Sequence, residues 1–323
     1  MFQDYKIAYI REHVKIKEVK PLNFLRQSVA YALSQSARNI PHAAMITHFD
    51  ITPLIEYAKT SEPKLKPEEG ETPEHFRLRR ALRRNYSTFF LKAIAHSLYY
   101  VPGVNAFLDY RRWRNGGTLY ISEDINISYT VNTKFGVIKP VVRNAHLKDI
   151  VTVASEMKDL TRRARRTDAN ELYRRIAFAY FKTMVKQLNF KELSVMWIVL
   201  RALLWNRPKP DPEFQDVPEE QRLQVSEFLG ATCTLANNGM MVSGNQTVTV
   251  IIPPEILMMG LSDLRLEPRV VNGQIVPRHV ITFFVTMDHR AFDAGEGFPG
   301  INYLKSYIEN PAKIYEWKPG DEI

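Results

Sequence analysis

The stretch VITFFVTMDHRAFDAGEG, residues 280–297, decides the fold class and contains the main candidate site. Its first half is a run of β-branched and aromatic residues, which predicts a buried strand. His289 follows at the end of that run, and Asp293 comes four residues later, ahead of a glycine-containing helix start. The histidine is therefore either an ordinary structural residue at a strand end or a base that the strand holds in position.

Imidazole is suited to the second role, because its unperturbed pKa of about 6.5 keeps it mostly neutral near pH 7. A neutral imidazole can take a proton from a thiol or an alcohol, and a nearby carboxylate can hold its surroundings in place. The local pattern of His289 and Asp293 leaves both roles open.

The bulk composition describes a folded globular protein. Of the 323 residues, 45% are hydrophobic and 24% are charged, which excludes a largely disordered chain. A single cysteine, Cys233, cannot form an internal disulfide, and the charged N-terminal residues do not resemble a signal peptide. The longest apolar stretch, Leu193–Trp205, is too short to span a bilayer and contains Arg201. We therefore expect a cytoplasmic protein with no transmembrane segment.

The formal net charge of +9 brings anionic partners into consideration, including nucleic acids, phosphorylated cofactors and acidic lipid surfaces. The sequence has no zinc-type cysteine spacing, no RNP-like aromatic motif and no phosphate loop of the G-x-x-x-x-G-K type. We expect neither a nucleic-acid partner nor a metal site.

Periodicity along the chain predicts a mixed α/β sheet layered with helices. Helical spacing is found around residues 21–41, 87–100, 147–166 and 297–309, and strand-like runs dominate the last third. Asn272-Gly273 between alternating residues predicts a two-residue hairpin turn. In the first helix, Arg26 lies along the apolar face, so its guanidinium should need a carboxylate partner. His96, on the amphipathic helix at 87–100, is expected at the surface or its boundary.

Several segments, in order, resemble the catalytic domain of dihydrolipoamide acyltransferases, the core components of 2-oxo acid dehydrogenase complexes. That family shares its fold and an H-x-x-x-D-G motif with chloramphenicol acetyltransferase. The resemblance covers nearly the whole chain except about residues 165–225. The segments that carry it are PLNFLRQSVAYALSQSARNIPHAAMITHFDITPLI (21–55), VPGVNAFLDY (101–110), INISYTVNTKFGVIKPVVRNAHLKDI (125–150), TCTLANNGM (232–240) and MDHRAFDAGEGFPGINYLKSYIENP (287–311).

The resemblance implies one catalytic domain over residues 1–323, with a chloramphenicol acetyltransferase-like sheet, in a homotrimer whose active sites lie between subunits. It implies that the thiol of coenzyme A and a dihydrolipoyl thiol enter a channel from opposite ends. His289 matches the family's general base. Asp293 matches its structural aspartate, which pairs with an arginine in this fold, and Arg26 is the partner that we expect. Lys134 and Lys139 border strands that run near coenzyme A in the family, so they could bind its phosphates.

Two positions depart from the family pattern. Ala236 stands where the family usually has a serine or threonine whose hydroxyl donates to the tetrahedral oxyanion, and Ala294 replaces the last glycine of the motif. Loss of one oxyanion donor typically lowers the rate by about 100- to 1000-fold. Asn237 or Thr234 could supply the missing donor.

Residues 165–225 form a predicted helical insertion that contains a proline-rich connector and the apolar stretch Leu193–Trp205. This apolar surface needs a cover, which could be packing within the trimer, a contact between trimers, another subunit of a dehydrogenase complex or a lipoyl-domain protein, or a membrane surface.

The sequence contains no lipoyl domain or swinging linker, so we expect the lipoyl group to be supplied in trans. The polar C-terminal residues predict a trimer that does not assemble into a large hollow core.

Two functions remain open at this point. The first is an acyltransferase that moves an acyl group between coenzyme A and a dihydrolipoyl thiol, with His289 as base. The second is a catalytically weak structural subunit of a dehydrogenase complex. The retained His289 and Asp293 favour the first, and Ala236 and the insertion favour the second.

Overall fold

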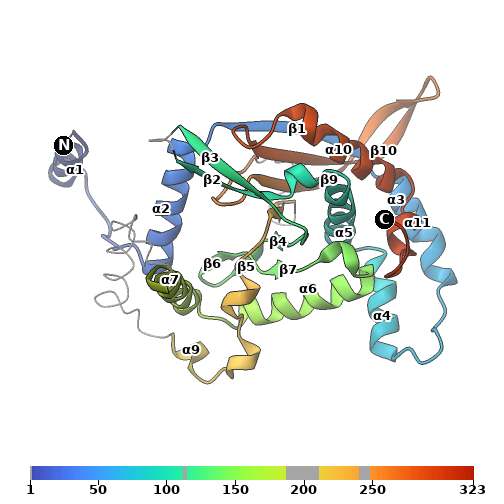
Figure 1. Ribbon diagram of the computed structural model, residues 1–323, viewed down its shortest axis with the longest axis horizontal. Coiled ribbons are helices and arrows are strands. Elements are labelled where there is room, and N and C mark those ends of the chain that lie inside the picture. The colour runs from blue at the N-terminus through green and yellow to red at the C-terminus, as the bar shows by residue number, and fades with distance from the viewer. Residues whose placement is uncertain (1, 112–114, 187–210, 240–247) are drawn as a thin grey trace.

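The structure is a computed structural model that describes residues 2–111, 115–186, 211–239 and 248–323. Figure 1 shows a central sheet with helices packed around it. The longer helices are α1 (Phe2–His13), α2 (Phe24–Asn39), α3 (Thr52–Ser61), α4 (Pro73–Leu82), α5 (Tyr86–Tyr99), α6 (Ile150–Arg165), α7 (Ala169–Lys186) and α10 (Ala294–Glu309), and α9 (Pro212–Gln215) and α11 (Ala312–Tyr315) are single turns.

The central sheet has six strands in the order β1-β10-β9-β8-β4-β7. β8 runs parallel to β4 and to β9, and the other neighbouring pairs are antiparallel. This confirms the predicted mixed α/β architecture. Two small hairpins, β2-β3 and β5-β6, lie outside the sheet. The strands are β1 (His42–Asp50), β2 (Ala106–Arg111), β3 (Gly116–Ile121), β4 (Ile127–Tyr129), β5 (Val131–Thr133), β6 (Gly136–Ile138), β7 (Val141–Val142), β8 (Cys233–Asn237), β9 (Leu257–Val271) and β10 (Gln274–Asp288).

The β9-β10 hairpin turns at Asn272-Gly273, as the sequence predicts. Both residues have positive φ, 51° and 79°, which is the conformation that a tight two-residue turn requires. Val271 pairs with Gln274 on either side of the turn. The inner halves of both strands are buried, so the apolar run 280–287 is the interior strand that the sequence predicts.

Helix α5 forms the centre of the core on one face of the sheet. The Asn85 side chain caps its first turn by accepting from the Thr88 backbone N–H at 3.2 Å, and every side chain from Thr88 to Leu98 is buried. The prediction for His96 was therefore wrong, because this side chain is only 1% exposed. The sequence spacing predicted that one face of α5 is exposed to solvent, but α6, α10 and the C-terminal residues cover that face as well.

Helix α7 begins the predicted insertion and packs against α2 (Figure 1). Asn170 Oδ1 accepts from the Leu25 backbone N–H at 3.2 Å at that contact. Leu193–Trp205 and the prolines as far as Pro210 lie outside the described residues, so the cover of that apolar stretch stays a prediction. In the part of the chain that the structure describes, no helix is both long enough and apolar enough to cross a membrane.

Candidate active site

His289 stands directly after β10, an interior strand of the sheet. β1 and β9 pair with β10 on its two sides. The His289 backbone N–H donates to the Pro41 carbonyl oxygen at 3.2 Å, which continues the β1-β10 pairing one step beyond His42 and Asp288. The side chain of His289 is 47% exposed. The sheet therefore holds the backbone of this residue while its imidazole remains accessible.

Asp293 orients the ring of His289. Asp293 Oδ1 lies 3.0 Å from His289 Nδ1, and Asp293 precedes α10 as its N-cap residue. Its backbone N–H donates to Glu296 Oε2 at 2.8 Å, which ties the aspartate to the first helical turn. Because Asp293 Oδ1 is an acceptor, the neutral imidazole carries its proton on Nδ1 and has a free lone pair on Nε2. Both side chains are largely exposed, so the pair orients the ring rather than stabilising the fold.

The expected ion pair between Arg26 and Asp293 is not formed in this chain. Arg26 is exposed on α2, and its side chain makes no ion pair within the described residues. The adjacent residue, Leu25, is the one that faces the core, at 4% exposure. The spacing argument was wrong because it placed Arg26 on the buried face of the helix, where a guanidinium would need a carboxylate.

Asp288 and Arg290 flank His289 and form a pair that the sequence analysis missed. Asp288 Oδ1 accepts from Arg290 Nε at 2.9 Å, and Oδ2 accepts from Arg290 Nη2 at 2.6 Å. The Asp288 side chain is 2% exposed, and Arg290 Nη1 also donates to the Asn39 carbonyl oxygen at 2.8 Å. This bidentate pair fixes the backbone on both sides of His289 and joins it to the end of α2. The adjacent Asp-His-Arg residues were the available signal.

Ala236 lies in an apolar cluster on the opposite face of the sheet from α5. It is 1% exposed and packs with Ile40, Ile251, Met258 and Phe284. Its register partner in β9 is Gly260, and a Cβ at Gly260 would come within 2.0 Å of the Phe284 ring. Two small residues therefore make room for one aromatic ring, and the position where the family has a hydroxyl packs against apolar side chains.

Thr234 and Asn237, the two residues predicted to replace that hydroxyl, already have partners. Thr234 is fully buried and its Oγ1 donates to Glu255 Oε2 at 2.6 Å, so its one hydroxyl proton is used. Asn237 Nδ2 donates to Ser87 Oγ at 2.7 Å, which leaves one amide proton. The structure does not bring either side chain into contact with His289, and their roles as oxyanion donors stay predictions.

Lys134 and Lys139 are both paired with carboxylates of the same chain. Lys134 Nζ lies 3.0 Å from Asp211 Oδ2 and 2.6 Å from Glu213 Oε2, both within the predicted insertion. Lys139 Nζ donates to Glu255 Oε1 at 3.0 Å and to Thr234 Oγ1 at 3.1 Å. These contacts neutralise both cations, so the geometry of the chain does not favour the predicted binding of coenzyme A phosphates.

A family model described as the 2-oxoacid dehydrogenases acyltransferase catalytic domain matches residues 15–172 and 213–316, which is more than half of the chain. The chain belongs to this acyltransferase family. The unmatched residues 173–212 fall inside the stretch predicted as an insertion, whose boundaries stay a prediction. The described residues contain no cluster of three or more metal-ligating side chains.

Curated relatives are similar at low identity over most of this chain. The acetyltransferase component of the mitochondrial pyruvate dehydrogenase complex of Caenorhabditis elegans is 25% identical over 298 residues, which is 90% of this chain and 44% of the relative. A probable succinyltransferase component of the mitochondrial 2-oxoglutarate dehydrogenase complex of Schizosaccharomyces pombe is 22% identical over 293 residues, 91% and 50% of the two chains. The chain thus spans about half the length of the relatives that it matches.

Solved structures share the fold. The dihydrolipoamide acetyltransferase of Azotobacter vinelandii superposes with a TM-score of 0.63 at 20% identity, covering 94% of this chain and 95% of the other. That structure was determined to investigate the role of a serine, a histidine and an asparagine four positions later in its catalytic mechanism. The cubic core of the pyruvate dehydrogenase multienzyme complex gives a TM-score of 0.61 at 21% identity, over 94% and 95% of the two chains.

Proposed function

We propose that this chain transfers an acyl group between coenzyme A and a dihydrolipoyl thiol that a separate protein supplies, with His289 as the general base. One observation carries the proposal. Asp293 binds Nδ1 of His289, and Nε2 of this accessible ring, at the end of an interior strand, has no hydrogen-bond partner among the residues that the structure describes. In the Azotobacter enzyme, the histidine and asparagine named for the mechanism have the same spacing as His289 and Asp293.

The proposed reaction needs one base and no redox step. The attacking thiol gives its proton to Nε2 of His289, and its sulfur bonds to the thioester carbonyl carbon. The tetrahedral adduct then breaks its bond to the other sulfur, which takes the proton back from the imidazolium. The Asp293 carboxylate stabilises the imidazolium between these two transfers, because the negative charge lies 3.0 Å from Nδ1.

The proposed assembly is a homotrimer with the site between subunits. The outer end of the β9-β10 hairpin projects beyond the other elements (Figure 1) and has an apolar face. Leu264, Leu266 and Val270 alternate along one face of β9, and Ile275 pairs with Val270 on the same face. Their exposed fractions range from 39% to 76%, which is a surface that monomeric proteins rarely leave uncovered. The lipoyl-domain partner and a cytoplasmic location are part of the same proposal.

A specific observation also favours a catalytically weak structural subunit. Ala236 offers no hydroxyl, and it packs with the apolar side chains of a hydrophobic cluster. Without an oxyanion donor, turnover would fall by about 100- to 1000-fold relative to an enzyme that has one.

Turnover of acetyl-coenzyme A and free dihydrolipoamide tests the proposal, with His289→Ala measured in parallel. We expect thioester exchange that depends on His289. Activity no higher than that of His289→Ala, across several acyl chain lengths, would leave only the structural role. Light scattering tests the assembly, where a particle of 24 or 60 chains would contradict the expected isolated trimer.

Ala236→Ser separates the two functions further. If weak turnover is caused by the missing hydroxyl, the serine should raise kcat by about 100-fold or more. An unchanged kcat in a folded variant would show that position 236 does not face the oxyanion.

A further inference from the structure

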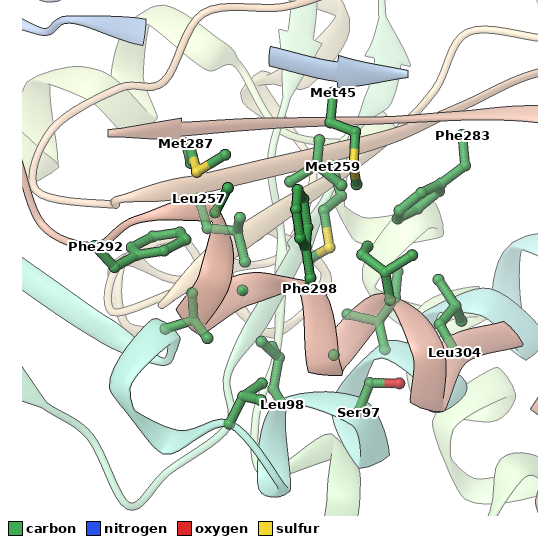
Figure 2. Close-up of a pocket in the computed structure, with 18 residues that line it drawn as sticks. Met45, Ser97, Leu98, Leu257, Met259, Phe283, Met287, Phe292, Phe298 and Leu304 are labelled. Atoms are coloured by element: carbon green, nitrogen blue, oxygen red, sulfur yellow. The ribbon is translucent and has the colours of Figure 1, made fainter. Parts of the chain in front are cut away.

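An apolar cavity of about 50 Å³ lies between the sheet and helices α5 and α10, beside the candidate site. Figure 2 shows its walls, which come from β1, β9, β10, α5 and α10. Of its eighteen lining residues, Ser97 has the only polar side chain, and Ser97 Oγ already donates to the Ala93 carbonyl oxygen at 2.8 Å. Within the described residues, no charged group faces this space.

The cavity and the His289–Asp293 pair share one short segment of chain. Met287 lines the cavity and is the last residue but one of β10, two positions before His289, so the two backbones lie no more than about 7 Å apart. Phe292 and Ala294 also line it, and they flank Asp293. When the carbonyl group of a thioester lies at the imidazole, a hydrocarbon chain of a few carbons is therefore long enough to reach this apolar cavity.

The lining determines which ligand would fit. A cavity of this volume holds about three or four water-sized groups, which corresponds to a chain of three or four carbons. Met45, Met259 and Met287 have flexible thioether side chains that can move to accept a branch or a slightly longer chain. A carboxylate in the same space would have no cation or hydrogen-bond donor to compensate for its lost water.

We propose that this cavity is the subsite for the hydrocarbon part of the acyl group, and that the preferred substrates are thioesters of uncharged aliphatic acids of four or five carbons, of which the carbonyl carbon stays at the imidazole. This inference rests on the proposed acyl-transfer function. It excludes acyl groups that end in a carboxylate, such as succinyl. Each carbon that fits an apolar pocket of this kind changes specificity by roughly 10- to 200-fold.

The first experiment compares kcat/KM for acetyl-, propionyl-, butyryl-, isobutyryl-, hexanoyl- and succinyl-coenzyme A with dihydrolipoamide as acceptor. Two variants reduce the cavity from different walls, Ala294→Leu on α10 and Ser97→Val on α5. Gly295→Ala is the matched control, because a Cβ there meets no other atom within 4 Å. We expect butyryl to exceed succinyl by at least 100-fold in the unchanged protein. Both filling variants should lower the ratio of butyryl to acetyl by at least 10-fold, whereas the control leaves the ratio unchanged.

The second experiment measures occupancy without catalysis. With ¹³C-methyl-labelled methionine, n-butane dissolved in the buffer should shift the signals of Met45, Met259 and Met287, and Ala294→Leu or Ser97→Val should reduce these shifts. Shifts without turnover of any thioester would refute the acyl-transfer function and retain the cavity as an aliphatic binding site. Turnover with no shifts, with equal use of succinyl, or with ratios that the filling variants leave unchanged would refute the cavity proposal and retain the function.

Discussion

Arg290→Ala should destabilise the protein by about 3 kcal/mol, because it leaves the buried carboxylate of Asp288 without its cation. The Asp288 side chain is 2% exposed and accepts two hydrogen bonds from the Arg290 guanidinium, at 2.9 and 2.6 Å. Breaking a buried ion pair from one side typically costs about 3–5 kcal/mol. The lower end applies here, because the Arg290 backbone N–H, 3.1 Å from Asp288 Oδ1, remains and the guanidinium itself is 20% exposed.

Urea unfolding followed by circular dichroism measures this loss, provided that the slope with denaturant is unchanged. Arg278→Ala is the matched control, since Arg278 Nε lies 2.6 Å from Asp50 Oδ2 but the Asp50 side chain is 34% exposed. That variant should lose no more than about 1 kcal/mol. Adding Asp288→Asn to Arg290→Ala should recover stability, because a neutral amide does not require a cation. A loss below 1 kcal/mol for Arg290→Ala would refute the reasoning that the pair is buried and uncompensated.

Three further outcomes follow from buried contacts. Gly260→Ala should lower the free energy of unfolding by about 1–3 kcal/mol, because its Cβ would lie 2.0 Å from the Phe284 ring. Urea unfolding of the double variant with Phe284→Leu should show that most of this loss is relieved. Lys139→Met should lower the free energy of unfolding by about 1.5–3 kcal/mol, because it removes the charged hydrogen bond to Glu255. The KM for coenzyme A should stay unchanged. A tenfold rise in this KM would instead support the predicted phosphate contact. Burial, assisted by the nearby charge of Lys92, lowers the pKa of His96 from 6.5 to about 3. The unfolded chain therefore takes up a proton below pH 6.5 that the folded chain does not bind, and this residue should make the protein about 2–3 kcal/mol less stable at pH 4.5 than at pH 7. In His96→Phe, the free energy of unfolding should differ less between pH 7 and pH 4.5 than in the unchanged protein, by that same amount. An equal difference in the two proteins would contradict the pKa shift.

Much of the fold could be predicted because its signals are local. The turn at Asn272-Gly273 needs two residues that tolerate positive φ, and both are adjacent in the sequence. The strand before His289 follows from eight consecutive apolar or β-branched residues, 280–287, and the helix after it from spacing within four turns. Each of these features depends on residues that are close together in the chain, so it can be predicted from the sequence without knowledge of distant contacts.

The partners of the charged side chains could not be predicted in this way. Arg26 was expected to meet Asp293, yet Asp293 binds His289 and Arg26 is exposed. Lys134 and Lys139 were expected near phosphates, yet both meet carboxylates that are 77 or more residues away in the sequence. Charge and helical spacing identify a group that needs a partner, but the partner depends on which distant segments lie side by side.

The sequence by itself determined the fold class, the family resemblance, and the position of His289 at the end of a buried strand, because periodicity and turn chemistry act over a few residues. Only the tertiary structure decided what surrounds these residues. It paired Arg290 with the buried carboxylate of Asp288 on either side of His289, packed Ala236 into an apolar cluster, and left an apolar cavity beneath α10. Burial and packing depend on contacts between segments far apart in the chain, and such contacts exist only in the folded protein.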